Sequence, residues 1–326
     1  MLRIGFTLSS EEERPHELVR LAGRAEDAGF DFATISDHFH PWTSAQGNSP
    51  FVWSVLGGIA TATNRLRVGA AVTCPLIRIH PAIVAQAAAT VTAMMPDRFF
   101  LGLGTGENLN EHVTGERWPS ASERRKLLRE AVDIIRELWG GGLVEHRGRG
   151  FEVVDAQLFT LPDRHPPIYV AAGGTKAAET AAEIGDGLIG TTPDRELIRT
   201  FDDGGGAGKP KLGQLTVCWA EDERTAVETA MTYWPTAALR GELTQELPLP
   251  RHFEQAAEMV TEDQLRNVVV CGPDPEPHVE MIRRYQDAGY DHVVIHQVGP
   301  DQEGGLRFLA ERVMPELPGD AAQKAS

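Results

Sequence analysis

Four residues whose side chains can donate, accept or hold a proton follow directly after a short apolar segment. The stretch "ATISDHFHPW" (33–42) places Asp37, His38, His40 and Trp42 where a buried strand gives way to a loop. An imidazole titrates near neutral pH and is the commonest general base in enzymes. The cluster therefore predicts a proton-transfer site, and its spacing alone leaves both histidines open as the base.

The same His-x-His spacing could also chelate a metal ion. Metal-dependent sites of this kind need further His or Asp ligands from later strand ends. The apolar segments that end near residues 172 and 190 finish instead in Ala-Gly-Gly and Gly-Thr-Thr. We therefore expect no metal site.

A second stretch, "GLGTGENLN" (102–110), resembles a phosphate-binding loop. It lacks the dinucleotide-binding pattern, because Glu107 occupies the third glycine position and its charge would repel a pyrophosphate. A carboxylate in a glycine-rich strand-end loop is suited to donating or accepting a proton. The alternative is that Glu107 only caps the following helix at its positive end.

A third stretch, "VAAGGTKAAETAAE" (170–183), reads as a strand, two glycines and a helix start. Backbone amides exposed at such a junction can bind an anion, so Gly173, Gly174, Thr175 and Lys176 are a candidate site for one phosphate group. A tight turn between strand and helix is the alternative interpretation.

Short apolar runs alternate with longer amphipathic segments along the chain, which is typical of repeated βα units. Helices are predicted at 15–29, 80–95 and 122–139. Eight such units predict an α/β fold of the (β/α)8 TIM-barrel class, whose active sites lie at the carboxyl ends of the strands. A doubly wound sheet is the alternative, but it usually has six strands and a dinucleotide motif. The predicted strands are 3–8, 32–36, 65–72, 99–104, 168–172, 187–190, 215–219 and 292–297.

The uneven spacing of these units predicts one domain, 1–317, with two insertions. The first, near 140–166, resembles a β-hairpin, and the second, near 233–285, contains extra helical material. Residues 204–211 read as a flexible connection and 318–326 as a flexible tail. The apolar segment "SPFVWSVLGGIATAT" (49–63) fits either a subunit interface or a buried helix.

Composition limits the possible partners and compartments of this 326-residue chain. Its formal net charge of -16 and pI near 5.1 argue against nucleic acid and anionic membranes as partners. Cys74, Cys218 and Cys271 share no disulfide or metal-ligand spacing. No leader pattern precedes the first strand and no window approaches 18 uninterrupted apolar residues, so we expect a cytoplasmic protein.

Three motifs in the same order, "SDHFHPW", "LGLGTGENLNEHVTG" and "IYVAAGGTKAAETAAEIGDGLIGT", resemble the luciferase-like flavin and deazaflavin oxidoreductases. The similarity is to the subgroup of coenzyme F420-dependent glucose-6-phosphate dehydrogenases and spans roughly residues 2–317. It implies a TIM barrel that binds the 8-hydroxy-5-deazaflavin F420, transfers a hydride from a C–OH carbon of a small molecule, and forms a homodimer. An FMN-dependent monooxygenase and a protein that only carries the deazaflavin are alternatives with the same fold.

The resemblance also implies roles for individual residues. His38 would act on the substrate hydroxyl, Trp42 would stabilise the charge that develops during transfer, and Glu107 would handle the proton at nitrogen 1 of the ring. Members of the family carry a non-prolyl cis peptide after the third strand, which would fall at Ala71–Val72. The residues implied in cofactor binding are Asp37, Ala71, Val72, Cys74, Thr105, Gly106, Asn110, Gly173, Gly174, Lys176 and Ala177.

The substrate region departs from the sugar-phosphate enzymes. Thr191 is retained, but Asp194 stands where those enzymes have a lysine, and the second insertion contains no lysine. A carboxylate facing a phosphate would repel it. We therefore expect a neutral alcohol or an unphosphorylated sugar as substrate, with glucose 6-phosphate as the alternative. The latter would require Arg240, Arg251 or Arg266 to supply the missing charge.

Overall fold

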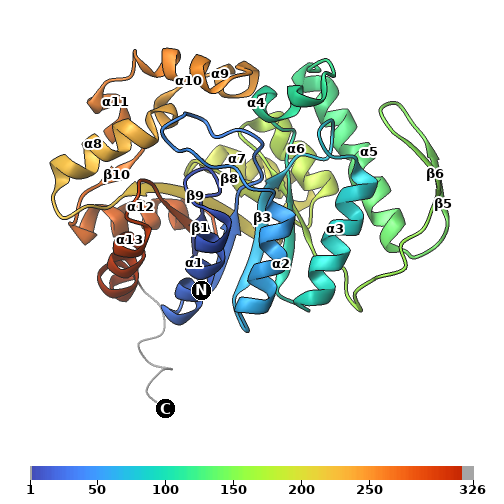
Figure 1. Cartoon of the computed structure of the whole chain (residues 1–326), viewed down its shortest axis with the longest axis horizontal. Helices are drawn as coiled ribbons and strands as arrows, with labels where there is room; N and C mark the ends of the chain where they lie inside the picture. Colours follow the sequence, from blue (N-terminus) through green and yellow to red (C-terminus); the bar gives the residue numbers. More distant parts are fainter. Residues whose placement is uncertain (1, 318–326) are drawn as a thin grey trace.

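Eight parallel strands form a closed barrel in the computed structural model, which describes residues 2–317 (Figure 1). The pairing order is β9-β11-β1-β2-β3-β4-β7-β8, and pairing of β8 with β9 closes the ring. The predicted TIM barrel is confirmed, while the predicted tail at 318–326 lies outside the described residues. The strands are β1 Arg3–Leu8, β2 Phe32–Ile35, β3 Arg67–Thr73, β4 Phe99–Leu103, β7 Ile168–Ala171, β8 Gly187–Gly190, β9 Lys211–Cys218 and β11 His292–Gln297.

Helices follow the strands and cover the outside of the barrel, as Figure 1 shows for α1, α2 and α3. In α1 the buried residues Leu18, Leu21, Ala22 and Ala25 recur at helical spacing, and a proline begins the helix. The helices outside the second insertion and the short strand-end elements are α1 Pro15–Asp27, α2 Val52–Ala62, α3 Pro81–Met94, α5 Ala121–Trp139, α6 Thr175–Ile184, α7 Arg195–Phe201, α8 Glu223–Tyr233, α12 Pro275–Ala288 and α13 Gln302–Phe308.

Short elements fill the two predicted insertions and several strand ends. The first insertion is an antiparallel hairpin of β5 and β6, as predicted. The second places α9, α10 and α11 above the barrel, with α9 beside α4 and α11 beside α8 (Figure 1). These elements are α4 Asn108–Glu111, η1 His112–Thr114, β5 Val144–Arg147, β6 Glu152–Ala156, η2 Asp202–Gly206, η3 Pro235–Ala238, α9 Leu243–Glu246, α10 Pro250–Ala257, α11 Glu262–Arg266, β10 Val270–Cys271, η4 Leu309–Val313 and η5 Met314–Glu316.

Strand β9 begins four residues before the predicted start, inside the segment predicted to be a flexible connection. The difference arises because a lysine opens the strand. Lys211 is buried, its backbone N–H donates to Asp291 Oδ1 at 2.9 Å, and its Nζ lies 2.9 Å from Asp202 Oδ1. The carboxylate of Asp202 thus pairs with a cation in a position where the sequence pattern favours an apolar residue, and that of Asp291 fixes the backbone at the start of the strand.

The apolar segment 49–63 forms α2, which packs between α1 and α3. Val52, Leu56 and Ile59 are fully buried in the core of this one chain. The buried-helix interpretation therefore accounts for most of the apolar character of the segment. Among the described residues, every helix is too short or too polar to span a bilayer.

Candidate active site

Two adjoining cavities open at the carboxyl ends of the barrel strands. The first has a volume of about 350 Å³ and the second about 430 Å³. Both include side chains from the second insertion, and five residues line both: Trp42, Thr191, Gln214, Trp234 and Thr244. The predicted catalytic residues His38, Trp42 and Glu107 all line the first cavity, together with Glu11 and His296, which the sequence analysis did not select.

His38 forms a buried pair with Glu11, which follows β1. His38 Nε2 lies 3.4 Å from Glu11 Oε1, and Ser36 Oγ donates to Glu11 Oε2 at 2.5 Å. Burial acts to raise the pKa of Glu11, but the neighbouring imidazole and the hydrogen bond from Ser36 outweigh it and lower the pKa. A carboxylate beside the imidazole stabilises the imidazolium that forms when His38 accepts a proton.

The surroundings of His38 and His40, the two candidates for the base, differ in the structure. His40 Nδ1 lies 2.8 Å from the carbonyl oxygen of Leu109, and its ring stacks on His112. It lines neither cavity. His38, in contrast, borders the first cavity and has the carboxylate of Glu11 next to it. Of the two histidines, His38 is the one that borders a cavity.

Asn110 holds the loop that carries His38. Its Oδ1 accepts hydrogen bonds from the backbone N–H of Phe39 at 2.9 Å and of His40 at 3.2 Å. Its Nδ2 lies 3.2 Å from His38 Nδ1 and 3.3 Å from Glu107 Oε2, so the amide bridges two of the predicted catalytic side chains. Asn110 is buried behind the cavity wall, where it orients these groups and does not line the space predicted for the ring.

Asp37 is engaged in a buried ion pair. Thr73 Oγ1 donates to Asp37 Oδ2 at 2.8 Å, and Arg78 Nη2 donates to Asp37 Oδ1 at 2.8 Å. The same arginine lies 3.6 Å from Glu111 Oε1 through its Nε. Asp37 is not part of either cavity lining, and its carboxylate is taken up by Thr73 and Arg78.

One wall of the first cavity is built largely from backbone. The peptide bond between Ala71 and Val72 is cis, as expected, and both residues line the wall. Gly104, Thr105 and Gly106 continue it. A Cβ added to Gly104 would lie 2.6 Å from Val72 Cγ2, so only glycine allows this close approach. The result is a smooth surface that suits a planar ring.

Cys74 lies behind this wall and not in it. Its Sγ would be 2.6 Å from a Cβ added at Gly106, which has a φ of 73°, and the thiol is buried. Desolvation raises the pKa of Cys74 well above its usual value, so the thiol stays protonated. Cys74 thus packs against Gly106 and does not line the first cavity.

The β7–α6 junction forms the far end of the first cavity. Gly173 and Ala177 line it, and Gly174 is the N-cap residue of α6. A helix N-terminus attracts an anion through its free amides and its dipole. Lys176 is exposed and lines neither cavity. Of the four residues that the glycine pattern predicted to hold a phosphate, Gly173 to Lys176, only Gly173 lines the first cavity.

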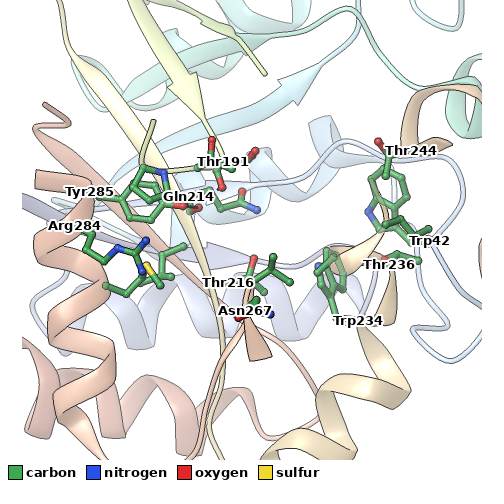
Figure 2. A pocket seen from close by; sticks show the side chains of 17 residues that line it. Trp42, Thr191, Gln214, Thr216, Trp234, Thr236, Thr244, Asn267, Arg284 and Tyr285 are labelled. Atoms are coloured by element: carbon green, nitrogen blue, oxygen red, sulfur yellow. Dashed lines mark hydrogen bonds between the residues drawn. The ribbon is translucent and has the colours of Figure 1, made fainter. Parts of the chain in front are cut away.

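The second cavity extends from the tryptophans toward α12. Figure 2 shows Trp42 and Trp234 at one end and Arg284 and Tyr285 at the other. Of the two residues predicted for the substrate, Thr191 lines both cavities and Asp194 lines neither. The carboxylate of Asp194 caps α7 by accepting from the backbone N–H of Glu196 at 2.8 Å, so it is not directed at a substrate. The predicted repulsion of a phosphate by Asp194 is not supported.

No group of three or more metal-ligating side chains occurs within residues 2–317. The histidines near the cavity instead contact carboxylates, carbonyls and aromatic rings. His38 approaches Glu11 at 3.4 Å, and Trp42 lies beside His38 with a ring-centroid distance of 5.1 Å. The arrangement can take up a proton from a bound hydroxyl in a cavity that has a flat wall for a second molecule.

Glu12, next to the pair, provides a test of the local electrostatics. Its Oε1 accepts from the backbone N–H of Gly299 at 2.9 Å, and burial raises its pKa to about 8. Between pH 5 and 8 the folded protein keeps a proton that the unfolded chain releases, so the free energy of unfolding falls as pH rises. We expect Glu12→Gln to remove this dependence, so that between pH 5 and pH 8 the variant gains about 3 to 4 kcal/mol of stability relative to wild type.

Thermal unfolding of wild type and Glu12→Gln at pH 5 and pH 8 measures the effect. The exposed Glu179 is the matched control, because its replacement by glutamine removes a charge without changing a buried group. An equal difference in melting temperature between wild type and Glu12→Gln at both pH values would contradict the assignment.

The fold and the site together define a class of protein: a parallel barrel with a histidine–carboxylate pair at the mouth and a glycine-rich wall in the same cavity. The luciferase-like monooxygenase family matches residues 2–292. The chain belongs to this family.

Three similar proteins are named as F420-dependent enzymes. An F420-dependent glucose-6-phosphate dehydrogenase of Microbacterium testaceum is 37% identical over 97% of each chain. One of Mycobacterium tuberculosis is 35% identical over 97% of this chain and 98% of its own length. The solved structure of an F420-dependent secondary alcohol dehydrogenase in complex with an F420-acetone adduct superimposes with a TM-score of 0.89 at 31% identity, covering 96% of this chain and 98% of that chain.

Proposed function

We propose that this protein is a coenzyme F420-dependent dehydrogenase that oxidises a C–OH group of a small molecule. The observation that carries the proposal is the Glu11–His38 pair in a cavity that Ala71, Val72 and Gly104 also line. We take coenzyme F420 as the cofactor because similar dehydrogenases are F420-dependent. A protein that only stored the deazaflavin would not need this base.

The described residues fit a deazaflavin. The wall of Ala71, Val72 and Gly104 offers a flat surface to the ring, and Gly104 leaves room that any side chain would fill. Gly173 and the N-terminus of α6 provide amides for the cofactor phosphate. When bound there, the deazaflavin accepts a hydride from carbon.

Gly104→Ala tests this fit. The added methyl group would push Val72 out of the wall, because the Cβ lies 2.6 Å from Val72 Cγ2. We expect the dissociation constant for F420 to rise about tenfold or more, by the usual cost of overpacking a tight contact. Fluorescence titration of F420 measures it. Gly57→Ala in α2, where a Cβ meets nothing within 4 Å, is the control and should bind F420 like wild type.

In the proposed mechanism, His38 is the base that accepts the proton of the substrate hydroxyl. The imidazole accepts the hydroxyl proton while Glu11 remains ionised and stabilises the cation. Trp42, 5.1 Å from the His38 ring, borders both cavities and provides an indole N–H near the reacting oxygen. Asn110 links His38 to Glu107, so the groups implied on the two sides of the reaction keep a fixed relation.

We propose a neutral alcohol or an unphosphorylated sugar as the substrate. The support for this proposal is the set of side chains that line the second cavity, because Asp194 does not line it. Its lining contains threonines, an asparagine and a glutamine but no lysine, whereas a phosphate dianion favours several cations.

A sugar phosphate remains the second candidate, because one cation does line the second cavity. Arg284 lies at its far end and forms no ion pair with any residue from 2 to 317. Turnover of glucose 6-phosphate that falls about tenfold or more in Arg284→Met, while turnover of glucose is kept, would favour this candidate.

The decisive experiment is anaerobic bleaching of the visible absorbance of oxidised F420 by the purified protein. The panel contains 2-propanol, longer secondary alcohols, glucose and glucose 6-phosphate. Bleaching with a neutral compound supports the proposal, and bleaching with glucose 6-phosphate alone would shift it to the second candidate. Tight F420 binding without bleaching by any compound would contradict a dehydrogenase. Preference for FMN and consumption of oxygen would indicate a monooxygenase.

We also infer a cytoplasmic homodimer. Phe51 and Ile83, on the neighbouring segments of α2 and α3, are 55% and 54% exposed, and large apolar side chains at that exposure are common where subunits meet. Sedimentation equilibrium would reveal a mass of two chains, and Phe51→Lys with Ile83→Lys should reduce it to one.

A further inference from the structure

His296 is a buried polar side chain that the mechanism above does not use. It lies near the carboxyl end of β11, in register with Thr216 of β9, and is 3% exposed. It lines the first cavity. Neither of its ring nitrogens has a hydrogen-bond partner among the described residues, although most buried polar groups in proteins are paired.

The imidazole of His296 is neutral when the protein works near pH 7. Burial lowers its pKa to about 4, against the opposing influence of Glu11. A neutral imidazole presents one N–H donor and one nitrogen acceptor. A hydroxyl group is the small ligand group that matches both, since it can donate to one nitrogen or accept from the other.

The position of His296 indicates that its hydrogen-bond partner is the substrate and not the cofactor. Its ring packs edge-on against Trp234, with the centroids 4.5 Å apart. Trp234 lines both cavities and so marks their junction, and Glu11 pairs with the base His38. The flat wall at Gly104 does not contribute to the second cavity. His296 therefore belongs to the side on which the substrate enters.

We propose that His296 hydrogen-bonds a second hydroxyl of the substrate, beside the one that His38 deprotonates, so that the enzyme favours vicinal diols and sugars over simple alcohols. This inference rests on the proposed dehydrogenase function and narrows its substrate class. Further uncharged polar side chains lead from His296 into the second cavity, since Gln214 and Thr191 line both cavities and Thr216 lines the second. They could hydrogen-bond additional hydroxyl groups of a sugar.

A matched pair of substrates tests the role in catalysis. Cyclohexanol and trans-1,2-cyclohexanediol differ by one neighbouring hydroxyl. We expect wild type to favour the diol, and His296→Phe to lower kcat/KM for the diol about tenfold to a hundredfold while changing that for cyclohexanol less than about threefold. His296→Asn, which keeps a donor and an acceptor, should recover part of the loss. Equal losses on both substrates, or no loss, would overturn the proposal.

A binding measurement separates this inference from the proposed function. In protein loaded with F420, the ring-nitrogen NMR signals of His296, assigned by their absence in His296→Phe, should shift with the diol and not with cyclohexanol. Shifts without turnover would refute the dehydrogenase but keep the diol site. Turnover without these shifts would refute the diol site. A change in F420 affinity in His296→Phe would place the histidine on the cofactor and also refute it.

Discussion

His38→Ala is expected to lower kcat by about 10²- to 10⁴-fold, the usual contribution of a positioned general base. The substrate hydroxyl then has to lose its proton without the imidazole that Glu11 supports at 3.4 Å. Glu11→Gln should have a smaller effect, about tenfold to a hundredfold, because the base remains but the imidazolium loses a charged partner. Initial rates of F420 bleaching measure both variants.

His40→Ala is the matched control for this prediction. His40 lies on the same loop two residues away, but its Nδ1 contacts the carbonyl of Leu109 and it lines neither cavity. We expect its kcat to stay within about threefold of wild type, as for residues that only support a loop. A large loss in His40→Ala with an active His38→Ala would reverse the assignment of the base. F420 affinity should be unchanged in both.

Arg78→Met is expected to destabilise the protein by about 3 to 5 kcal/mol, which is the typical cost of leaving buried charges without their partner. Arg78 is the cation between the carboxylates of Asp37 and Glu111, both of which have fully buried side chains. Methionine keeps the length of the side chain but not its charge. The free energy of unfolding from urea titration gives the difference.

A surface ion pair provides the comparison. Arg20 pairs with Glu17 and Glu303, but its side chain is half-exposed. We expect Arg20→Met to cost less than about 1 kcal/mol, since solvent screens such pairs. Equal effects of the two substitutions would show that the Asp37–Arg78–Glu111 cluster is not the stabilising feature described here. Loss of F420 binding in Arg78→Met below its melting temperature would show that Asp37 acts on the cofactor site through this arginine.

The barrel was predictable because its strands are short apolar runs separated by well-marked helices. Seven of the eight strands lie within two residues of their predicted bounds, since burial on both faces gives an unambiguous pattern. Strand β9 was predicted too short because Lys211, a buried cation, begins it. The two-residue strand β10 carries no pattern long enough to recognise.

The sequence predicts the site residues that lie together in one loop motif. It does not predict those that reach the site from distant segments of the chain. Glu11 belongs to "SSEEER", which resembles a solvated helix start, and only the fold shows that it faces His38. Arg78 follows a proline-containing loop and gives no pattern. His296 could have been found, because the alternation in "HVVIHQ" puts it on the same strand face as Val294, with a polar group opposing the apolar trend.

The two cavities are lined by the barrel and by the second insertion in different proportions. Strand ends and their glycines line most of the first, whereas the second takes Trp234, Thr236, Thr244 and Asn267 from the inserted segment between β9 and α12. Changes in this segment leave the barrel ladder and the flat wall intact. The two halves of the reaction can therefore diverge separately during evolution: relatives can exchange the molecule they oxidise by altering one insertion while the hydride acceptor and its binding surface stay the same.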